Sequence, residues 1–217
     1  MTTLRNERDC ERYGFLNRCS LESDTTSDDL TFRVTPIGKW APQTQSYLGG
    51  RDVRYVSVSA LGLPNEAEER RATIDYGLEV AGTDLIYDVT GEFLQGKARP
   101  FECDLKPGSA RIYAVLPFQL EIVSARVAQT AALERSPTVQ VEFQQASGER
   151  IAGVLPFHLQ LLRPDGEAEH QSWRATNGEG HLRESLAIAA NAPQGRWSLV
   201  IRSQLNGQSQ TLALEVD

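Results

Sequence analysis

The chain has 217 residues, 40% of them hydrophobic, which is enough to build the cores of two domains of roughly 100 residues each. Its formal net charge of -7 at pH 7 argues against binding to nucleic acid or to an anionic membrane surface. Every apolar run is far shorter than the roughly 18 residues that cross a bilayer, so we expect no membrane insertion.

The first 28 residues are polar and charged, and they predict a segment without a stable fold. From Leu30 onward, three stretches alternate apolar and polar residues, which predicts half-buried strands. They are LTFRVT (30–35), DVRYVSVSAL (52–61) and ATIDYGLEV (72–80). In the second stretch we expect Val56 and Val58 to face the core, because the opposite face carries Tyr55 and two serines.

A β-hairpin is predicted over residues 84–96, with LIYDV before the turn, EFL after it, and Thr90–Gly91 as the turn itself. Residues 98–105 predict another strand. Pro107 and Gly108 are a strong turn signal, and SARIYAVLPF follows as the next strand. These elements predict a first β-sandwich over residues 29–117.

The second half predicts seven short strands with turn residues between them. The strands are residues 119–128, 138–145, 155–164, 169–176, 180–188, 195–204 and 210–217. Turn signals about every 8–14 residues are typical of an immunoglobulin-like β-sandwich, although the Cys…Trp…Cys pattern of antibody domains is not present. The predicted fold is therefore all-β, with two consecutive antiparallel β-sandwich domains (29–117 and 118–217), the second of them Ig-like.

One phrase occurs twice. RIYAVLPFQL (111–120) and RIAGVLPFHL (150–159) are identical at seven positions, at an offset of 39 residues. The match extends on neither side and the period does not continue, so the pattern of a solenoid or propeller is missing. We expect both copies to mark the point where a turn ends and an apolar strand begins, since proline is tolerated at strand starts. Duplication of a whole domain is the alternative.

Residues that could carry chemistry are few. A zinc site needs three or four clustered ligands, and the chain has three histidines, of which His170 and His181 fall on neighbouring predicted strands and could face one another. We expect structural histidines instead. The carboxylate pairs near turns are expected to be solvated or capping groups, since glycosidase chemistry needs two acids placed across a sugar cleft. These pairs are Asp84 with Asp88 and Asp75 with Glu79.

Other cofactor patterns are also missing from the sequence. It contains no phosphate-binding or dinucleotide-binding glycine motif, and DGE at 165–167 reads as a hairpin turn and not as a calcium loop. Cys10 and Cys19 are equally consistent with a disulfide and with free thiols. We therefore predict no catalytic residue, no metal site and no cofactor.

The three tryptophans are predicted to play different roles. Trp197 begins the apolar strand WSLVI and is expected in the core, whereas Trp173 lies in the polar strand EHQSWRAT and is more exposed. Trp40 lies with Tyr47 in a predicted loop, GKWAPQTQSYLGG (38–50). The candidate binding residues are therefore Trp40, Tyr47 and Trp173. The predicted core comprises Val56, Val58, Ile74, Tyr113, Leu159, Leu161, Trp197, Leu199 and Leu214.

Two segments resemble known modules. Residues 85–117 resemble the β-sandwich that follows the barrel in bacterial proteins associated with glycoside hydrolases. The matching residues are Tyr87, Asp88, Gly91, Asp104, Leu105, Pro107, Gly108, Arg111, Tyr113, Leu116 and Pro117. The second half is similar to macroglobulin-type or bacterial Ig-like domains through LLRPDG (161–166), NAPQGRWSL (191–199) and SQLNGQ (203–208). Neither motif set contains catalytic residues.

The resemblance implies a non-catalytic accessory module that gives support, spacing or weak carbohydrate binding within a larger carbohydrate-active or surface protein. Its expected partners are a polysaccharide or the catalytic domain of the same polypeptide, in an extracellular or periplasmic location. One alternative is an adhesion or assembly module that acts by protein–protein contact, for example through strand pairing. A second is an enzyme whose site the sequence does not reveal.

Overall fold

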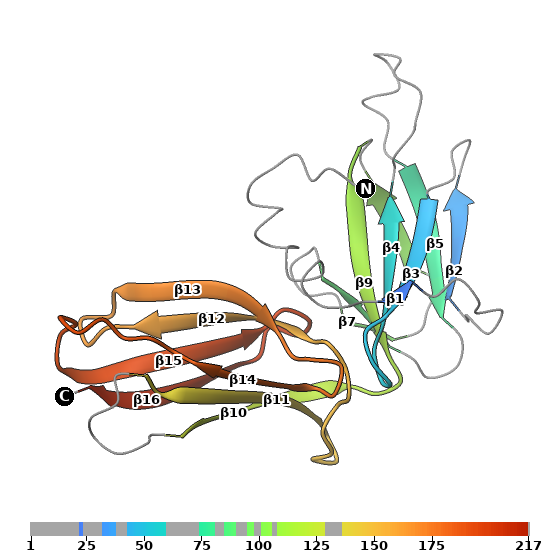
Figure 1. Cartoon of the computed structure of the whole chain (residues 1–217). Coiled ribbons are helices and arrows are strands. Elements are labelled where there is room, and N and C mark those ends of the chain that lie inside the picture. The colour runs from blue at the N-terminus through green and yellow to red at the C-terminus, as the bar shows by residue number, and fades with distance from the viewer. Residues whose placement is uncertain are drawn as a thin grey trace. The chain divides into compact units, whose positions relative to one another are not determined.

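The computed structural model describes residues 22–23, 32–37, 43–59, 74–80, 85–89, 95–97, 101–105, 108–128 and 136–216. Within these ranges the regular structure consists of strands and includes no helix (Figure 1). Every pairing between strands is antiparallel, which confirms the predicted all-β class. The chain divides at Leu120 into two compact units. The immunoglobulin-like type of the second half stays a prediction.

The unit before Leu120 contains two sheets. The larger has the strand order β1-β3-β4-β9-β6-β7, and the smaller has the order β2-β5-β8. The strands of the larger sheet are β1 (Glu22–Ser23), β3 (Gln43–Leu48), β4 (Arg54–Ser59), β6 (Leu85–Asp88), β7 (Gln95–Lys97) and β9 (Ala110–Leu116). Those of the smaller are β2 (Phe32–Ile37), β5 (Ile74–Val80) and β8 (Phe101–Leu105).

Strand β4 has buried side chains on both of its faces. Val56 and Val58 are buried as predicted, but Tyr55, which was expected to face outward, is also fully buried. A strand that is covered on both sides loses the alternation from which its inward face could be recognised. The two serines on the Tyr55 side are only partly buried, and because of them that face was assigned to solvent.

The predicted hairpin over residues 84–96 is an antiparallel pair of β6 and β7. The described part of its second arm is Gln95–Lys97, and EFL (92–94), which was predicted to open that arm, lies outside the described residues. After β8, the turn that contains Gly108 leads into β9, which belongs to the other sheet. Gly108 has a φ of 76°, a conformation that side chains other than glycine rarely adopt.

The unit that begins at Leu120 has seven strands in two sheets, with the orders β10-β11-β14 and β13-β12-β15-β16 (Figure 1). The first sheet contains β10 (Leu120–Ala128), β11 (Thr138–Gln145) and β14 (His181–Ser185). The second contains β12 (Pro156–Leu162), β13 (Ala168–Ala175), β15 (Gly195–Ser203) and β16 (Ser209–Val216). All seven agree with the predicted strands to within a few residues at their ends.

The core of this unit lies between its two sheets. Phe143 of β11 and Phe157 of β12 are fully buried and their ring centroids lie 6.0 Å apart, which brings the inner faces together. Trp197 is also fully buried, and its indole N–H donates to the carbonyl of Pro193 at 2.9 Å. Every predicted core residue that can be assessed is buried; Ile74 lies outside the residues with described side chains.

Side chains close both open sides of this unit. On one side, the Gln210 amide of β16 donates to the carbonyl of Ala125 at 3.2 Å and accepts from the amide of the same residue. On the other, Arg174 of β13 makes two hydrogen bonds to the Glu184 carboxylate of β14, of 2.8 and 3.0 Å. Strand edges attract foreign strands, and side-chain contacts of this kind obstruct such pairing.

Candidate functional site

The structure places the three predicted binding residues in different settings. Trp40 lies outside the described residues. Tyr47 is half-buried and lies in β3, between β1 and β4, so the loop prediction was wrong over Gln43–Leu48. The glycine and proline residues that suggested a loop flank this strand and do not interrupt it. Trp173 lies in β13, as predicted, and is half-buried.

Trp173 belongs to the outward face of the sheet β13-β12-β15-β16. On β12, Phe157, Leu159 and Leu161 are buried, so the alternation of the strand turns His158 and Gln160 outward. The register pairs His158 with Trp173 and Gln160 with Gln171. These four side chains therefore share one face, which we call the aromatic face.

The centre of the aromatic face is the contact between two rings. The centroids of His158 and Trp173 are 4.6 Å apart, with 42° between the ring planes. Desolvation by burial and the charge of Arg202 lower the pKa of His158 from its usual 6.5. The imidazole is therefore neutral at pH 7, and the pair combines an apolar ring surface with hydrogen-bonding nitrogens.

Polar groups surround this pair of rings. The Gln160 amide donates to the Gln171 carbonyl oxygen at 3.5 Å. Arg202 is the register partner of His158 on β15 and is exposed. Strands are spaced by about 4.8 Å, so Trp173 and Arg202 are about 10 Å apart across the face. Such a surface can stack on a flat ring and hydrogen-bond to its polar edge.

A tight turn after β12 borders this face. The Gly166 amide donates to the carbonyl of Arg163 at 3.0 Å, and Asp165 accepts from the Glu167 amide at 2.9 Å. Gly166 has a φ of 87°, which glycine allows at little cost. The hairpin-turn reading of DGE is therefore confirmed, and its carboxylates serve the turn and the nearby Arg163.

His170 and His181, which the sequence left as a possible facing pair, do not face one another. His170 lies on β13 and His181 on β14, and these strands belong to different sheets because the chain crosses over between them. The His170 ring instead contacts the Ser172 hydroxyl at 3.1 Å. Three or more potential metal ligands come together nowhere in the described part of the chain.

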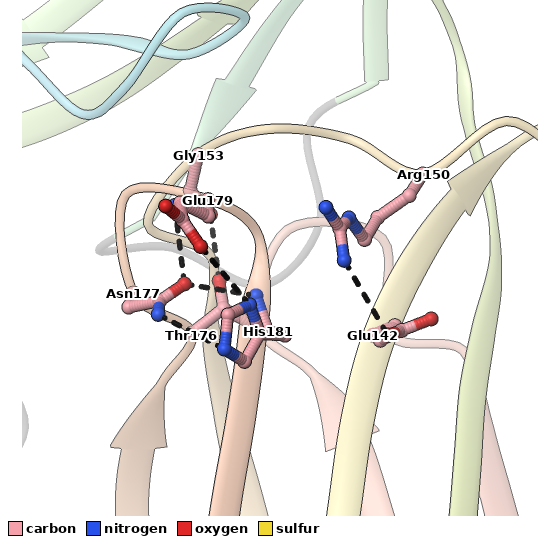
Figure 2. Close-up of polar contacts among 7 residues, drawn as sticks. All are labelled: Glu142, Arg150, Gly153, Thr176, Asn177, Glu179 and His181. Carbon is pink, nitrogen blue, oxygen red and sulfur yellow. Dashed lines mark hydrogen bonds and ion pairs between the residues drawn. The ribbon is translucent and has the colours of Figure 1, made fainter.

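His181 belongs to the turn that Figure 2 shows. Its amide donates to the Asn177 side-chain oxygen at 3.1 Å, and the Asn177 side-chain nitrogen lies 3.3 Å from His181 Nε2. When Nε2 accepts, the ring proton is on Nδ1, 3.8 Å from the Glu179 carboxylate. The three side chains hold the turn in shape, and a structural histidine is what this geometry supports.

In the same turn, Thr176 is buried and hydrogen-bonds to residues 151–155. We call these residues, which lead into β12, the crossing segment. Its hydroxyl donates to the Gly153 carbonyl at 2.7 Å (Figure 2). The same hydroxyl accepts from the Leu155 amide at 2.8 Å. Gly180 packs against that segment so closely that a Cβ atom there would lie 1.7 Å from the carbonyl oxygen of Ile151. The turn thus locks residues 151–155 in place.

One of the carboxylates that were expected to be solvated is instead buried. The side chain of Asp88 at the end of β6 is 1% exposed and lies 3.4 Å from the Arg111 guanidinium of β9. Both residues belong to the motif that resembles the glycoside-hydrolase-associated sandwich, and their pairing ties two neighbouring strands of one sheet together. The other acidic residues of those pairs, Asp75, Glu79 and Asp84, lie outside the described side chains.

Comparisons with known proteins do not identify a family for this chain. No family model matches the chain, and a search of curated proteins finds no match. A glycosyl hydrolase family 2 member from Bacteroides cellulosilyticus is similar at 11% identity and a TM-score of 0.28, over 76% of this chain and 27% of that one. A β-glucuronidase from Ruminococcus gnavus is similar at 11% identity and a TM-score of 0.24, over 77% and 37%.

The chain thus spans less than half the length of these two enzymes. Likenesses of this strength carry no argument about what the chain does. In the described part of the chain, no helix is long and apolar enough to cross a membrane.

Sequence reasoning found Trp173 but missed its surroundings. His158 and Gln160 alternate with buried residues in FHLQL, and this alternation already predicted that they face outward. What could not be predicted is their pairing with Trp173 and Gln171, because that depends on the register across the hairpin.

Proposed function

We propose that this chain is a non-catalytic accessory module that binds carbohydrate weakly through the aromatic face, as part of a larger carbohydrate-active protein. The observation that carries the proposal is the Trp173–His158 pair on the outward face of the sheet, bordered by Gln160 and Gln171. An indole supplies a large, rigid contact area at low entropic cost, which suits the apolar face of a sugar ring. The glutamine amides offer donors and acceptors for hydroxyl groups.

Affinity electrophoresis of the full chain through gels that contain neutral or acidic polysaccharides tests the proposal. We expect retardation by at least one polymer, and its loss in Trp173→Ala. Asn191→Ala changes an exposed side chain in the loop between β14 and β15 and is the matched control. Free migration in every gel would exclude carbohydrate binding and leave a spacer or assembly role.

Turnover must be measured on the same preparation. An accessory module should hydrolyse no glycoside or ester substrate. Hydrolysis that a single Asp, Glu or His substitution abolishes would show instead that the chain is an enzyme.

A further inference from the structure

The opposite sheet of the same unit carries a second polar face. On the outward side of β10-β11-β14, the register aligns Arg126, Gln140 and Arg183 in one row across the three strands. All three side chains are exposed. With strands about 4.8 Å apart, the two arginines lie about 10 Å from each other on either side of Gln140. We call these three residues the arginine row.

Among the described side chains, the two rows beside it contain one carboxylate, Glu142, which is already paired with an arginine outside the row. On one side lie Ser124, Glu142 and His181, and the Glu142 carboxylate is engaged by Arg150 at 3.7 Å. On the other side Thr138 and Ser185 share a hydrogen bond of 3.4 Å between their hydroxyls. In the described part of the chain, neither arginine of the row has an acidic register partner.

Two positive charges on one face of a sheet repel each other and do not stabilise the fold. The chain as a whole carries a net charge of -7, so a positive row stands out against its surroundings. Guanidinium groups present planar arrays of donors that match carboxylate oxygens, and such charge-assisted hydrogen bonds are stronger than neutral ones. We propose that the arginine row is a second binding site, and that its ligand is a carboxylate-bearing saccharide.

The surroundings favour a saccharide over an acidic peptide. Protein partners anchor on apolar and aromatic side chains at the centre of an interface. The described side chains of the arginine row and of the rows beside it are instead amides, hydroxyls, a histidine and charged groups. Such groups suit a ligand rich in hydroxyls, with carboxylates that lie over the two guanidiniums. The site is distinct from the aromatic face, which belongs to the other sheet.

The test measures binding of the full chain to polygalacturonic acid and to the same polymer after reduction of its carboxyl groups, by titration calorimetry. We expect binding to the acidic polymer, with weaker binding at higher salt, and no binding to the reduced one. Arg126→Gln and Arg183→Gln should each weaken binding about tenfold, as the loss of a charge-assisted hydrogen bond does. Arg196→Gln, an exposed arginine whose register partner is Glu215, is the matched control and should bind normally.

Several results would overturn the inference. They are equal binding of the reduced polymer, unchanged binding in the double variant Arg126→Gln/Arg183→Gln, no binding to the acidic polymer, or tighter binding to poly-L-glutamate. Trp173→Ala separates this site from the proposed function. If that variant abolishes binding of the acidic polymer while the arginine variants do not, the arginine row is wrong and the aromatic face stands. The arginine variants should keep their melting temperature, since their side chains are exposed.

Discussion

The two copies of the repeated phrase fold differently. In the first copy, RIYAVLPFQL, residues up to Leu116 form β9, which pairs with β4 on one side and with β6 on the other. In the second, RIAGVLPFHL, residues 151–155 belong to no strand, and β12 begins only at Pro156. The expected apolar strand is therefore found in both copies, but it begins at Ala110, just before the first copy, and only at Pro156, inside the second.

What the copies share is burial and not hydrogen bonding. The Val-Leu pair is buried in both, with Val115 at 7% and Val154 at 5% exposure and both leucines at 0%. The backbone of the first copy is satisfied by neighbouring strands, whereas that of the second is satisfied by Thr176 and by Phe143, whose carbonyl accepts from Ile151. The same apolar string can thus be a sheet strand or a crossing segment, depending on the partners that the rest of the chain supplies.

The largest expected effect comes from Gly180→Ala. Glycine at this position has a φ of 81°, and a Cβ atom would lie 1.7 Å from the Ile151 carbonyl oxygen in the second copy. Backbone strain and the displaced segment should together cost more than about 3 kcal/mol of the free energy of unfolding. Gly148→Ala is the control, because Gly148 has a similar φ of 82° but open space around it. Equal losses in urea denaturation would show that the close contact does not matter.

The arginines that open the two copies should differ in their importance. Arg111→Gln leaves the Asp88 carboxylate, 1% exposed, without its cation, whereas Arg150→Gln breaks a pair in which both side chains are more than 40% exposed. We expect a loss of roughly 2–4 kcal/mol for the first, less than for a fully buried pair because Arg111 is partly exposed. The second should cost under about 1 kcal/mol. Chemical denaturation of both variants checks this, and a larger loss for Arg150→Gln would contradict it.

Much of the architecture was predictable because turns and alternation are local properties. TVQVEFQQ was predicted as a strand over the same residues, 138–145, that form β11. Tyr47 was misplaced because Gly and Pro at both ends of its segment outweighed a short polar strand. Tyr55 was misplaced because burial on both faces leaves no alternation to detect.

The candidate site was less predictable than the fold. Trp173 stood out by its residue type, but its contact with His158 depends on the register of β12 and β13. The arginine row likewise joins residues 126, 140 and 183, which only the pairing of three strands brings together. A binding face on a sheet is a property of register, and register is not visible in any one strand.

A smaller effect should follow from Thr176→Val, which removes a hydroxyl from the second copy while keeping the shape of the side chain. The Leu155 amide and the Gly153 carbonyl would both lose their hydrogen bonds to that hydroxyl. Unsatisfied buried groups cost about 1–3 kcal/mol, so we expect a loss of about 2 kcal/mol. Thr176→Ser keeps the hydroxyl and serves as the control. If the serine variant loses as much stability as the valine variant, the hydrogen bonds are not what holds the crossing segment.

The smallest effect concerns the one position in the shared PF-x-L ending where the copies differ, Gln119 and His158. Burial and the charge of Arg202 lower the pKa of His158 below 6.5, so the folded protein binds a proton there less readily than the unfolded chain does. Stability that depends on His158 is therefore complete above pH 6.5 and declines as the pH falls through this value towards the lower, folded pKa. His158→Gln, which installs the residue of the first copy, should lose stacking on Trp173 at every pH but escape this decline. Urea denaturation of both proteins between pH 8 and pH 5 measures the difference in the pH dependence of their stability. Parallel pH profiles would show that His158 titrates alike in the folded and unfolded states.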